Sequence, residues 1–260
     1  MAGRDPTIRQ LPLDLPTQPA LLREDFLAAP GNAAALALVD TFPDWPARVV
    51  CLVGPAGAGK SHLGAIFART ADALTLPARD LTRAGVPQAL AHGALLLEDL
   101  VAGAFDEAAL FHLLNLAREQ NAFVLMTART PPSGFALATA DLVSRLRAVP
   151  SVEIAPADDA LLGAVLVKLF GDRQIPVDDA TVQYLLLRME RTVEGAQALV
   201  AAIDRTALAA RRPVTRALAA QVLREEKNLC GEGQGALDDE PSNDEGDVPK
   251  DGQDTSSQPS

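Results

Sequence analysis

The stretch Gly54-Pro55-Ala56-Gly57-Ala58-Gly59-Lys60-Ser61 decides the fold. It fits the pattern G-x-x-x-x-G-K-[ST], follows the apolar run Val49–Val53 and precedes a helical stretch from Ser61 to Thr70. Backbone N–H groups must wrap a phosphate chain in such a loop, so it needs glycines that accept unusual dihedral angles and allow close approach. Lys60 would reach the β- and γ-phosphates, and the Ser61 hydroxyl would bind Mg²⁺. The segment therefore predicts a strand, a P-loop and a helix that bind a nucleotide.

Around this loop the chain divides into four sections. Residues 1–22 are an extended arm that contains Pro and Gln, and residues 23–156 alternate strand-like and helical runs, as an α/β domain with a parallel sheet does. Residues 157–227 contain helical patterns only, which predicts a small helical domain. Residues 228–260 are rich in Asp, Glu, Gly, Ser and Pro, and we expect this tail to be disordered. No internal repeat is present.

The expected strands and helices follow from apolar spacing. The expected strands are Arg48–Val53, Ala94–Leu97, Phe123–Thr127 and Ser151–Ile154. The expected helices of the last domain are Asp158–Phe170, Asp178–Met189, Glu194–Ala210 and Thr215–Glu225, with N-caps at Asp158, Asp178 and Thr215.

The net charge of −11 is concentrated in the tail. Residues 228–260 hold nine acidic residues and one basic residue, which leaves −3 for the rest of the chain. The body has no basic stripe, so we expect no direct, specific DNA binding.

No apolar run approaches about 20 residues, which predicts no membrane association. Met1 to Asp14 lack the layout of a signal peptide, and only Cys51 and Cys230 are present, so we expect a cytoplasmic protein.

Two further apolar strands end in polar residues. Leu95-Leu96-Leu97 is followed by Glu98 and Asp99. In P-loop ATPases the first acid of such a pair holds Mg²⁺ and the second polarises the attacking water. The common order begins with Asp, so Glu98 is one methylene too long for the near-ideal geometry that Mg²⁺ prefers, and we expect weak intrinsic hydrolysis. Thr127, at the tip of the next strand, is predicted to lie between the acids and the γ-phosphate, and Arg129 is a further candidate there.

Two arginines complete a pattern that is typical of AAA+ ATPases. Arg145 lies in Leu142-Val143-Ser144-Arg145-Leu146-Arg147, where AAA+ chains project an arginine finger into the nucleotide site of a neighbouring subunit. Arg147 is a rival for this role. Arg191 opens the third helix of the last domain and is predicted to fold back on the β- and γ-phosphates. The motifs together predict an α/β AAA+ P-loop NTPase core with a parallel sheet, followed by a small all-helical lid domain.

Residues 23–226 resemble the AAA+ module of the bacterial replication initiator DnaA. The resemblance rests on Gly59-Lys60-Ser61-His62-Leu63, Leu142-Val143-Ser144-Arg145 and Arg191-x-x-Glu194-Gly195, with Asp25-Phe26 and Asn32 in the entry segment. It implies bound ADP or ATP with Mg²⁺, ADP being favoured, and it adds His62 and Arg191 to the residues that hold the nucleotide. DnaA carries a helix-turn-helix DNA-binding domain after its lid, whereas the acidic tail follows here.

The arm contains a second recognisable motif. Gln10-Leu11-Pro12-Leu13-Asp14-Leu15 is similar to the Q-L-x-L-x-L peptide by which proteins dock on the bacterial sliding clamp. Gln10 would form a hydrogen bond at the rim of the docking groove, and Leu11, Leu13 and Leu15 would fill the groove.

With this arm, the chain resembles the Hda type of DnaA-related AAA+ proteins. The resemblance implies a negative regulator of chromosome replication initiation, with the sliding clamp (the β subunit of DNA polymerase III) and DnaA as partners. The clamp would keep it at the replisome, and Arg145 would stimulate hydrolysis of DnaA-bound ATP in trans. Self-association into a homo-oligomer is a further expectation.

Two alternatives remain open. A helicase-loader-like AAA+ ATPase would need strong hydrolysis of its own and a DNA-contacting surface, against which the near-neutral body and the Glu98-Asp99 order argue. A non-catalytic adaptor, in which the nucleotide only stabilises the fold, would share every motif and differ in the role of Arg145 alone.

Overall fold

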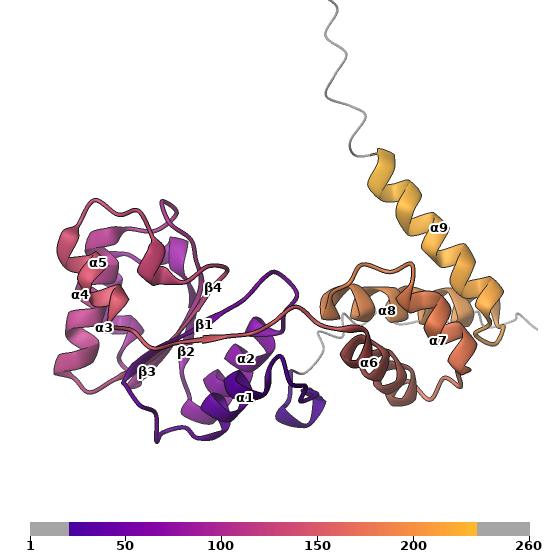
Figure 1. The fold of residues 1–260 in the computed structure, drawn as a ribbon, viewed down its shortest axis with the longest axis horizontal. Helices are drawn as coiled ribbons and strands as arrows, with labels where there is room; N and C mark the ends of the chain where they lie inside the picture. The colour runs from indigo at the N-terminus through magenta and orange to yellow at the C-terminus, as the bar shows by residue number, and fades with distance from the viewer. Residues whose placement is uncertain (1–20, 233–260) are drawn as a thin grey trace, which may run out of the picture.

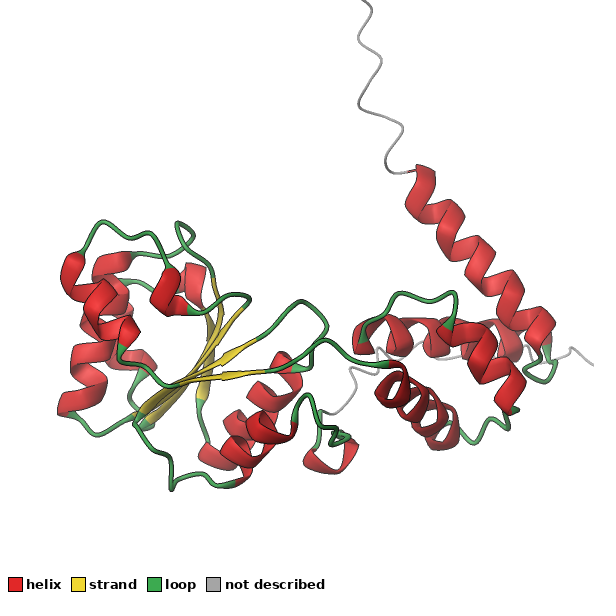
Figure 2. Cartoon of the chain, in the orientation of Figure 1, coloured by secondary structure: helices red, strands yellow, loops and turns green. Residues whose placement is uncertain are grey.

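The computed structural model describes residues 21–232. A parallel five-stranded sheet forms the centre of the α/β part, with the strand order β2-β3-β4-β1-β5. Figure 2 shows the sheet in yellow between helices. The strands are β1 Val49–Val53, β2 Leu74–Pro77, β3 Ala94–Leu100, β4 Phe123–Ala128 and β5 Ser151–Glu153. The three inner strands β3, β4 and β1 are buried apolar runs, as expected where helices cover both faces of a parallel sheet. The predicted α/β class is confirmed.

Helices cover both faces of the sheet. Helices α1 (Ala33–Asp40) and α2 (Lys60–Ala71) lie on one face, and α3 (Val86–Ala89), α4 (Glu107–Glu119) and α5 (Ala140–Arg147) lie on the other (Figure 1). Leu63 and Phe67 of α2 pack on the first face. The ring of Trp45 stacks on that of Phe67, with the ring centroids 4.9 Å apart. Short 3₁₀ turns complete this part: η1 Arg23–Asp25, η2 Ala78–Asp80, η3 Arg83–Gly85 and η4 Pro132–Gly134.

A second hydrophobic core holds the lid together. Its helices are α6 (Asp159–Asp172), α7 (Asp179–Leu186), α8 (Val193–Ala210) and α9 (Arg216–Glu232), and they bury Leu166, Phe170, Leu185 and Ile203 among themselves. The three predicted N-caps are confirmed, because their side chains accept hydrogen bonds from backbone N–H groups of the first turns. These bonds are Leu161 N to Asp158 at 2.8 Å, Thr181 N to Asp178 at 2.7 Å and Leu218 N to Thr215 at 3.3 Å.

Several element boundaries differ from the sequence-based expectation. Strand β2 was not predicted, since it is a short edge strand with a half-exposed pattern that pairs with β3 alone. Strand β3 continues beyond Leu97 through both acids to Leu100. Helix α7 ends at Leu186 instead of Met189, because the chain must turn before Thr192 caps α8. Helix α9 runs to Glu232 instead of Glu225, as no proline follows Pro213 until Pro241.

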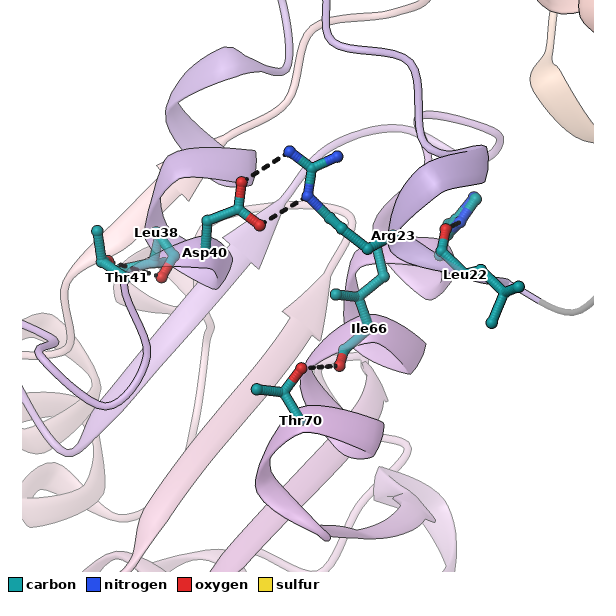
Figure 3. A network of polar contacts seen from close by, with 8 residues as sticks. Leu22, Arg23, Leu38, Asp40, Thr41, Ile66 and Thr70 are labelled. Carbon is teal, nitrogen blue, oxygen red and sulfur yellow. Dashed lines mark hydrogen bonds and ion pairs between the residues drawn. The ribbon is translucent and has the colours of Figure 1, made fainter.

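The first described residues are fixed to the α/β part (Figure 3). Arg23 donates to both carboxylate oxygens of Asp40, with Nε–Oδ1 2.7 Å and Nη2–Oδ2 2.8 Å, a bidentate ion pair that orients the segment along α1. The predicted clamp peptide, Gln10 to Leu15, and residues 233–260 lie outside the described residues. Within residues 21–232, no helix has the length and apolar character that a membrane crossing requires.

Candidate nucleotide-binding site

The loop from Gly54 to Gly59 leaves β1 and enters α2 directly. Gly57 and Gly59 have φ angles of 72° and 91°, in the left-handed region that glycine adopts without steric cost. The Gly54 N–H donates to the carbonyl of Ala128 on β4 at 3.1 Å, and a Cβ on Gly54 would lie 2.6 Å from the carbonyl oxygen of Ile154. The glycines are therefore required by the path of the backbone, as the sequence predicted.

Lys60 carries a buried positive charge into this loop. Its Nζ donates to the carbonyl oxygens of Gly54 at 2.8 Å and Pro55 at 2.6 Å, and its side chain is almost fully buried. Burial lowers the pKa of Lys60, while the nearby negative charge of Asp99 acts in the opposite direction. A cation that is poorly solvated, beside loop N–H groups at the start of α2, fits the phosphates of a nucleotide.

Asp99 and Thr127 meet at the carboxyl edge of the sheet. The pairing of β3 with β4 shifts between Leu97 and Leu100, and Asp99 has a φ angle of 53° in this irregularity. Its N–H donates to the Thr127 hydroxyl at 3.0 Å, and Thr127 is buried. Since the charge of Asp99 also acts on Lys60, the structure brings the lysine, the second acid and the threonine together.

Glu98 and Ser61 are the predicted Mg²⁺ ligands. Glu98 is half-buried, and its pKa is raised by burial first and by the charge of Asp99 second. Ser61 lies exposed in the first turn of α2. Among residues 21–225, whose side chains the structure describes, there is no group of three or more His, Cys, Asp or Glu side chains that could hold a metal ion by itself. Mg²⁺ commonly binds through one or two protein ligands together with phosphate oxygens, so the pair remains a prediction that depends on the nucleotide.

The lid contacts the loop through the start of α8. A Cβ on Gly57 would clash with the side chain of Thr192 and would lie 2.9 Å from Glu194 Oε2. Arg191 is exposed, and its Nη2 lies 2.6 Å from Asp159 Oδ1 at the start of α6. Within this motif the contacts with the loop are thus made by Thr192 and Glu194, and a role of Arg191 at the phosphates stays a prediction.

A cavity of about 910 Å³ adjoins the loop. Its walls come from the entry segment, from the start of α2 and from the lid helices α6 and α8, and include Phe26, Asn32, His62, Leu161, Val165 and Val193. His62 Nε2 lies 2.8 Å from the carbonyl oxygen of Leu22, and its ring meets that of Phe26 edge to face at 5.2 Å. A largely apolar cavity next to a phosphate loop suits the base and ribose of a nucleotide.

An ion pair joins the entry segment to the lid at this cavity. Lys168 Nζ on α6 lies 2.8 Å from Asp25 Oδ1 and 2.8 Å from Asp172 Oδ2. Sequence reasoning missed Lys168, since Asp25 and Lys168 are separated by 143 positions and no local pattern marks the lysine. It also missed the contacts of Thr192 and Glu194, although both stand in the motif that was chosen for Arg191.

Arg145 lies near the end of α5, on the helix that joins β4 to β5. Helix α5 begins after the carboxyl end of β4 and leads to the amino end of β5, so it runs back across the sheet and its last turn points to the amino edge (Figure 1). Arg145 is half-buried, with its guanidinium carbon 4.9 Å from the centroid of the Phe111 ring on α4, whereas Arg147 is exposed. Both arginines therefore lie toward the amino edge of the sheet, opposite the edge that carries the loop.

Comparison with known proteins identifies the fold. No family model matches the chain, and no curated protein matches it. The solved structure of DnaA bound to AMPPCP and single-stranded DNA matches with a TM-score of 0.64 at 18% identity, over 84% of this chain and 72% of that one. Domain III of DnaA from Thermotoga maritima gives 0.65 at 15% identity, over 81% and 98%. The chain has a DnaA-like AAA+ fold. The Thermotoga maritima RuvB branch migration motor is also similar, with 0.56 at 16% identity over 67% and 60%.

We expect Lys60→Ala to abolish nucleotide binding. Without the ammonium, the loop loses the one buried cation that faces the phosphates. In the wild-type chain, ADP at 100 times its Kd should stabilise the fold by about 2.7 kcal/mol, measured as a rise in melting temperature. Lys60→Ala should show no rise, while Arg69→Ala, an exposed change further along α2, should show the full one. An undiminished rise in Lys60→Ala would place the nucleotide elsewhere.

Proposed function

We propose that this chain is a negative regulator of chromosome replication initiation, which binds the sliding clamp and stimulates hydrolysis of DnaA-bound ATP in trans. The observation that carries the proposal is the position of Arg145 in a DnaA-like AAA+ fold. An arginine at the edge of the sheet opposite the phosphate loop can reach a nucleotide only in another subunit. We infer DnaA as the partner, because it has an AAA+ domain of similar fold with a nucleotide that Arg145 could reach.

The nucleotide of the chain itself has a supporting role in this proposal. The loop from Gly54 to Ser61 would hold the phosphates, Ser61 and Glu98 would be the protein ligands of Mg²⁺, and His62 and Arg191 would also hold the nucleotide. The metal ion would supply positive charge that neutralises the β- and γ-phosphates. Because Glu98 replaces the usual Asp and the activating arginine must come from another subunit, bound ADP is favoured over rapid turnover. When this chain docks on DnaA, Arg145 would approach the nucleotide of DnaA. In the absence of DnaA, a homo-oligomer would form through the same type of contact between two copies of this chain.

Recruitment would depend on the arm. Gln10, Leu11, Leu13 and Leu15 lie outside the described residues, but the chain that follows them enters the α/β part through Leu22 and Arg23, on the surface of α1 and α2. The arm would thus reach the clamp while the rest of the chain remains free to contact DnaA. Such binding would place the protein at the replisome in the bacterial cytoplasm.

A non-catalytic adaptor is the alternative that one observation favours. The guanidinium of Arg145 rests on the ring of Phe111 in the same chain, which is an intramolecular role for this side chain. In an adaptor, Arg145 would only pack, and partner binding would not change the rate of hydrolysis. A helicase-loader-like ATPase would instead show robust turnover by the isolated chain.

We expect Arg145→Ala to lose the stimulation of DnaA. Arginine fingers contribute about 10³–10⁵ in rate, so the hydrolysis of radiolabelled ATP on DnaA should fall to its basal rate when this variant replaces the wild type on clamp-loaded DNA. Nucleotide and clamp binding should persist. Arg147→Ala, an exposed change two residues away, is the matched control and should remain active. If both Arg145→Ala and Arg147→Ala are fully active, the result would support the adaptor. If Arg145→Ala is active and Arg147→Ala is inactive, the arginine finger would be Arg147.

A chain with Gln10, Leu11, Leu13 and Leu15 all changed to alanine should lose clamp binding. The physical reason is the loss of the side chains that would fill an apolar groove, and the measurement is surface plasmon resonance on immobilised clamp. The ADP-dependent rise in melting temperature should stay at its wild-type value, because these positions precede the nucleotide site. Clamp binding of unchanged affinity would refute recruitment through the arm.

A further inference from the structure

On the lid, two exposed arginines lie against the only tyrosine of the chain, and two more exposed arginines precede one of them in the sequence. Tyr184 lies on α7, with the Arg188 guanidinium carbon 4.1 Å and the Arg216 guanidinium carbon 4.7 Å from its ring centroid. Arg211 and Arg212 precede Arg216 in the connection between α8 and α9. We call these five residues the arginine–tyrosine surface.

The positive charges of this surface are only partly balanced by nearby acids. Among residues 21–225, whose side chains the structure describes, none of its four arginines forms an ion pair within 4.0 Å. The charge of Arg216 does act on Asp178, but the pKa of Asp178 is lowered first by hydrogen bonds from Thr181. All four arginines are exposed, so their guanidinium groups are free to bind carboxylates in bidentate pairs.

The placement of Arg216 also opposes the preference of its helix. It is the first residue of α9, and the amino end of a helix disfavours cations. Two guanidinium groups held on one ring raise the local positive potential further. An anionic group bound here would relieve both the unfavourable placement at the helix end and the repulsion between the two guanidinium groups.

We propose that residues 233–260 of the same chain dock on the arginine–tyrosine surface through their carboxylates. Residues 238–247 contain six acidic residues and no basic one, which makes the segment complementary in charge to the surface. The segment is also covalently attached to the lid, so its effective concentration at the surface is high compared with that of a free partner.

The chain length allows this contact. Helix α9 has 17 residues, so its end lies about 25 Å from Arg216 at 1.5 Å per residue. Asp244 lies twelve positions beyond Glu232, and a chain of that length can span up to about 40 Å. The second half of the acidic run, from Asp244 to Asp247, can therefore return to the start of α9. Nucleic acid is the competing occupant, but it is disfavoured by the net charge of −11 and by the tethered acids.

The test uses Tyr184 as a single spectroscopic probe in the full chain. With ¹³C-labelled tyrosine, the ring gives one set of NMR signals. Neutralising the acidic run (Asp238, Asp239, Asp244 and Asp247 to Asn, Glu240 and Glu245 to Gln) should shift these signals. Raising the ionic strength of the wild type from about 0.05 M to about 0.5 M should move them in the same direction, since salt screens exposed charge pairs.

Coupling to the arginines distinguishes docking from a general charge effect. When Arg188→Gln and Arg216→Gln are combined, neutralising the acidic run should cause no further shift. With the control pair Arg69→Gln and Arg118→Gln, both exposed in the α/β part, the full shift should remain. Melting temperatures verify that each variant is folded. The proposal is overturned if neutralising the acidic run does not shift the Tyr184 signals. It is also overturned if this shift has the same size when Arg188 and Arg216 are both replaced by Gln. Binding of labelled single-stranded DNA by the wild type that depends on these two arginines would assign the surface to nucleic acid instead.

Discussion

Lys60 brings its ammonium group into the bend between β1 and α2, where the carbonyl oxygens of Gly54 and Pro55 accept its hydrogen bonds. Burial of this charge is costly, as the lowered pKa indicates, and the surrounding structure is arranged so that anionic groups act on it. Asp99 supplies one such group from β3, and the hydroxyl of Thr127 fixes the backbone of Asp99. The loop, two strands and the start of α2 thus meet at the ammonium group of Lys60, whose charge suits phosphates.

The lid position depends on the same loop. Gly57 has no side chain, which allows Thr192 and Glu194 to approach, and any other residue there would push the lid away. On the far side of the cavity, Lys168 ties α6 to Asp25 of the entry segment, and His62 ties α2 to Leu22. A ligand in the cavity would contact all three parts, so the nucleotide state, the lid and the entry segment that follows the arm are physically connected.

Much of this site could be predicted from the sequence, because its parts are local. The P-loop spacing, the acids after an apolar strand and Thr127 after the next one depend on short segments, and parallel strands bring their carboxyl ends to one edge. The lid contacts could not be predicted, since Asp25 and Lys168 meet only in the folded chain. The motif at Arg191 lies beside the loop, but Arg191 forms an ion pair with Asp159, and the residues that contact the loop are its neighbours.

The nucleotide that co-purifies with the full chain tests the account most directly. Acid release followed by anion-exchange chromatography gives its identity and its amount per chain. The account predicts close to one adenine nucleotide per chain, mostly ADP, since a weakly hydrolytic site between the loop and the lid retains its product. A chain that carries no nucleotide, and that takes up neither ADP nor ATP when these are added with Mg²⁺, would contradict it.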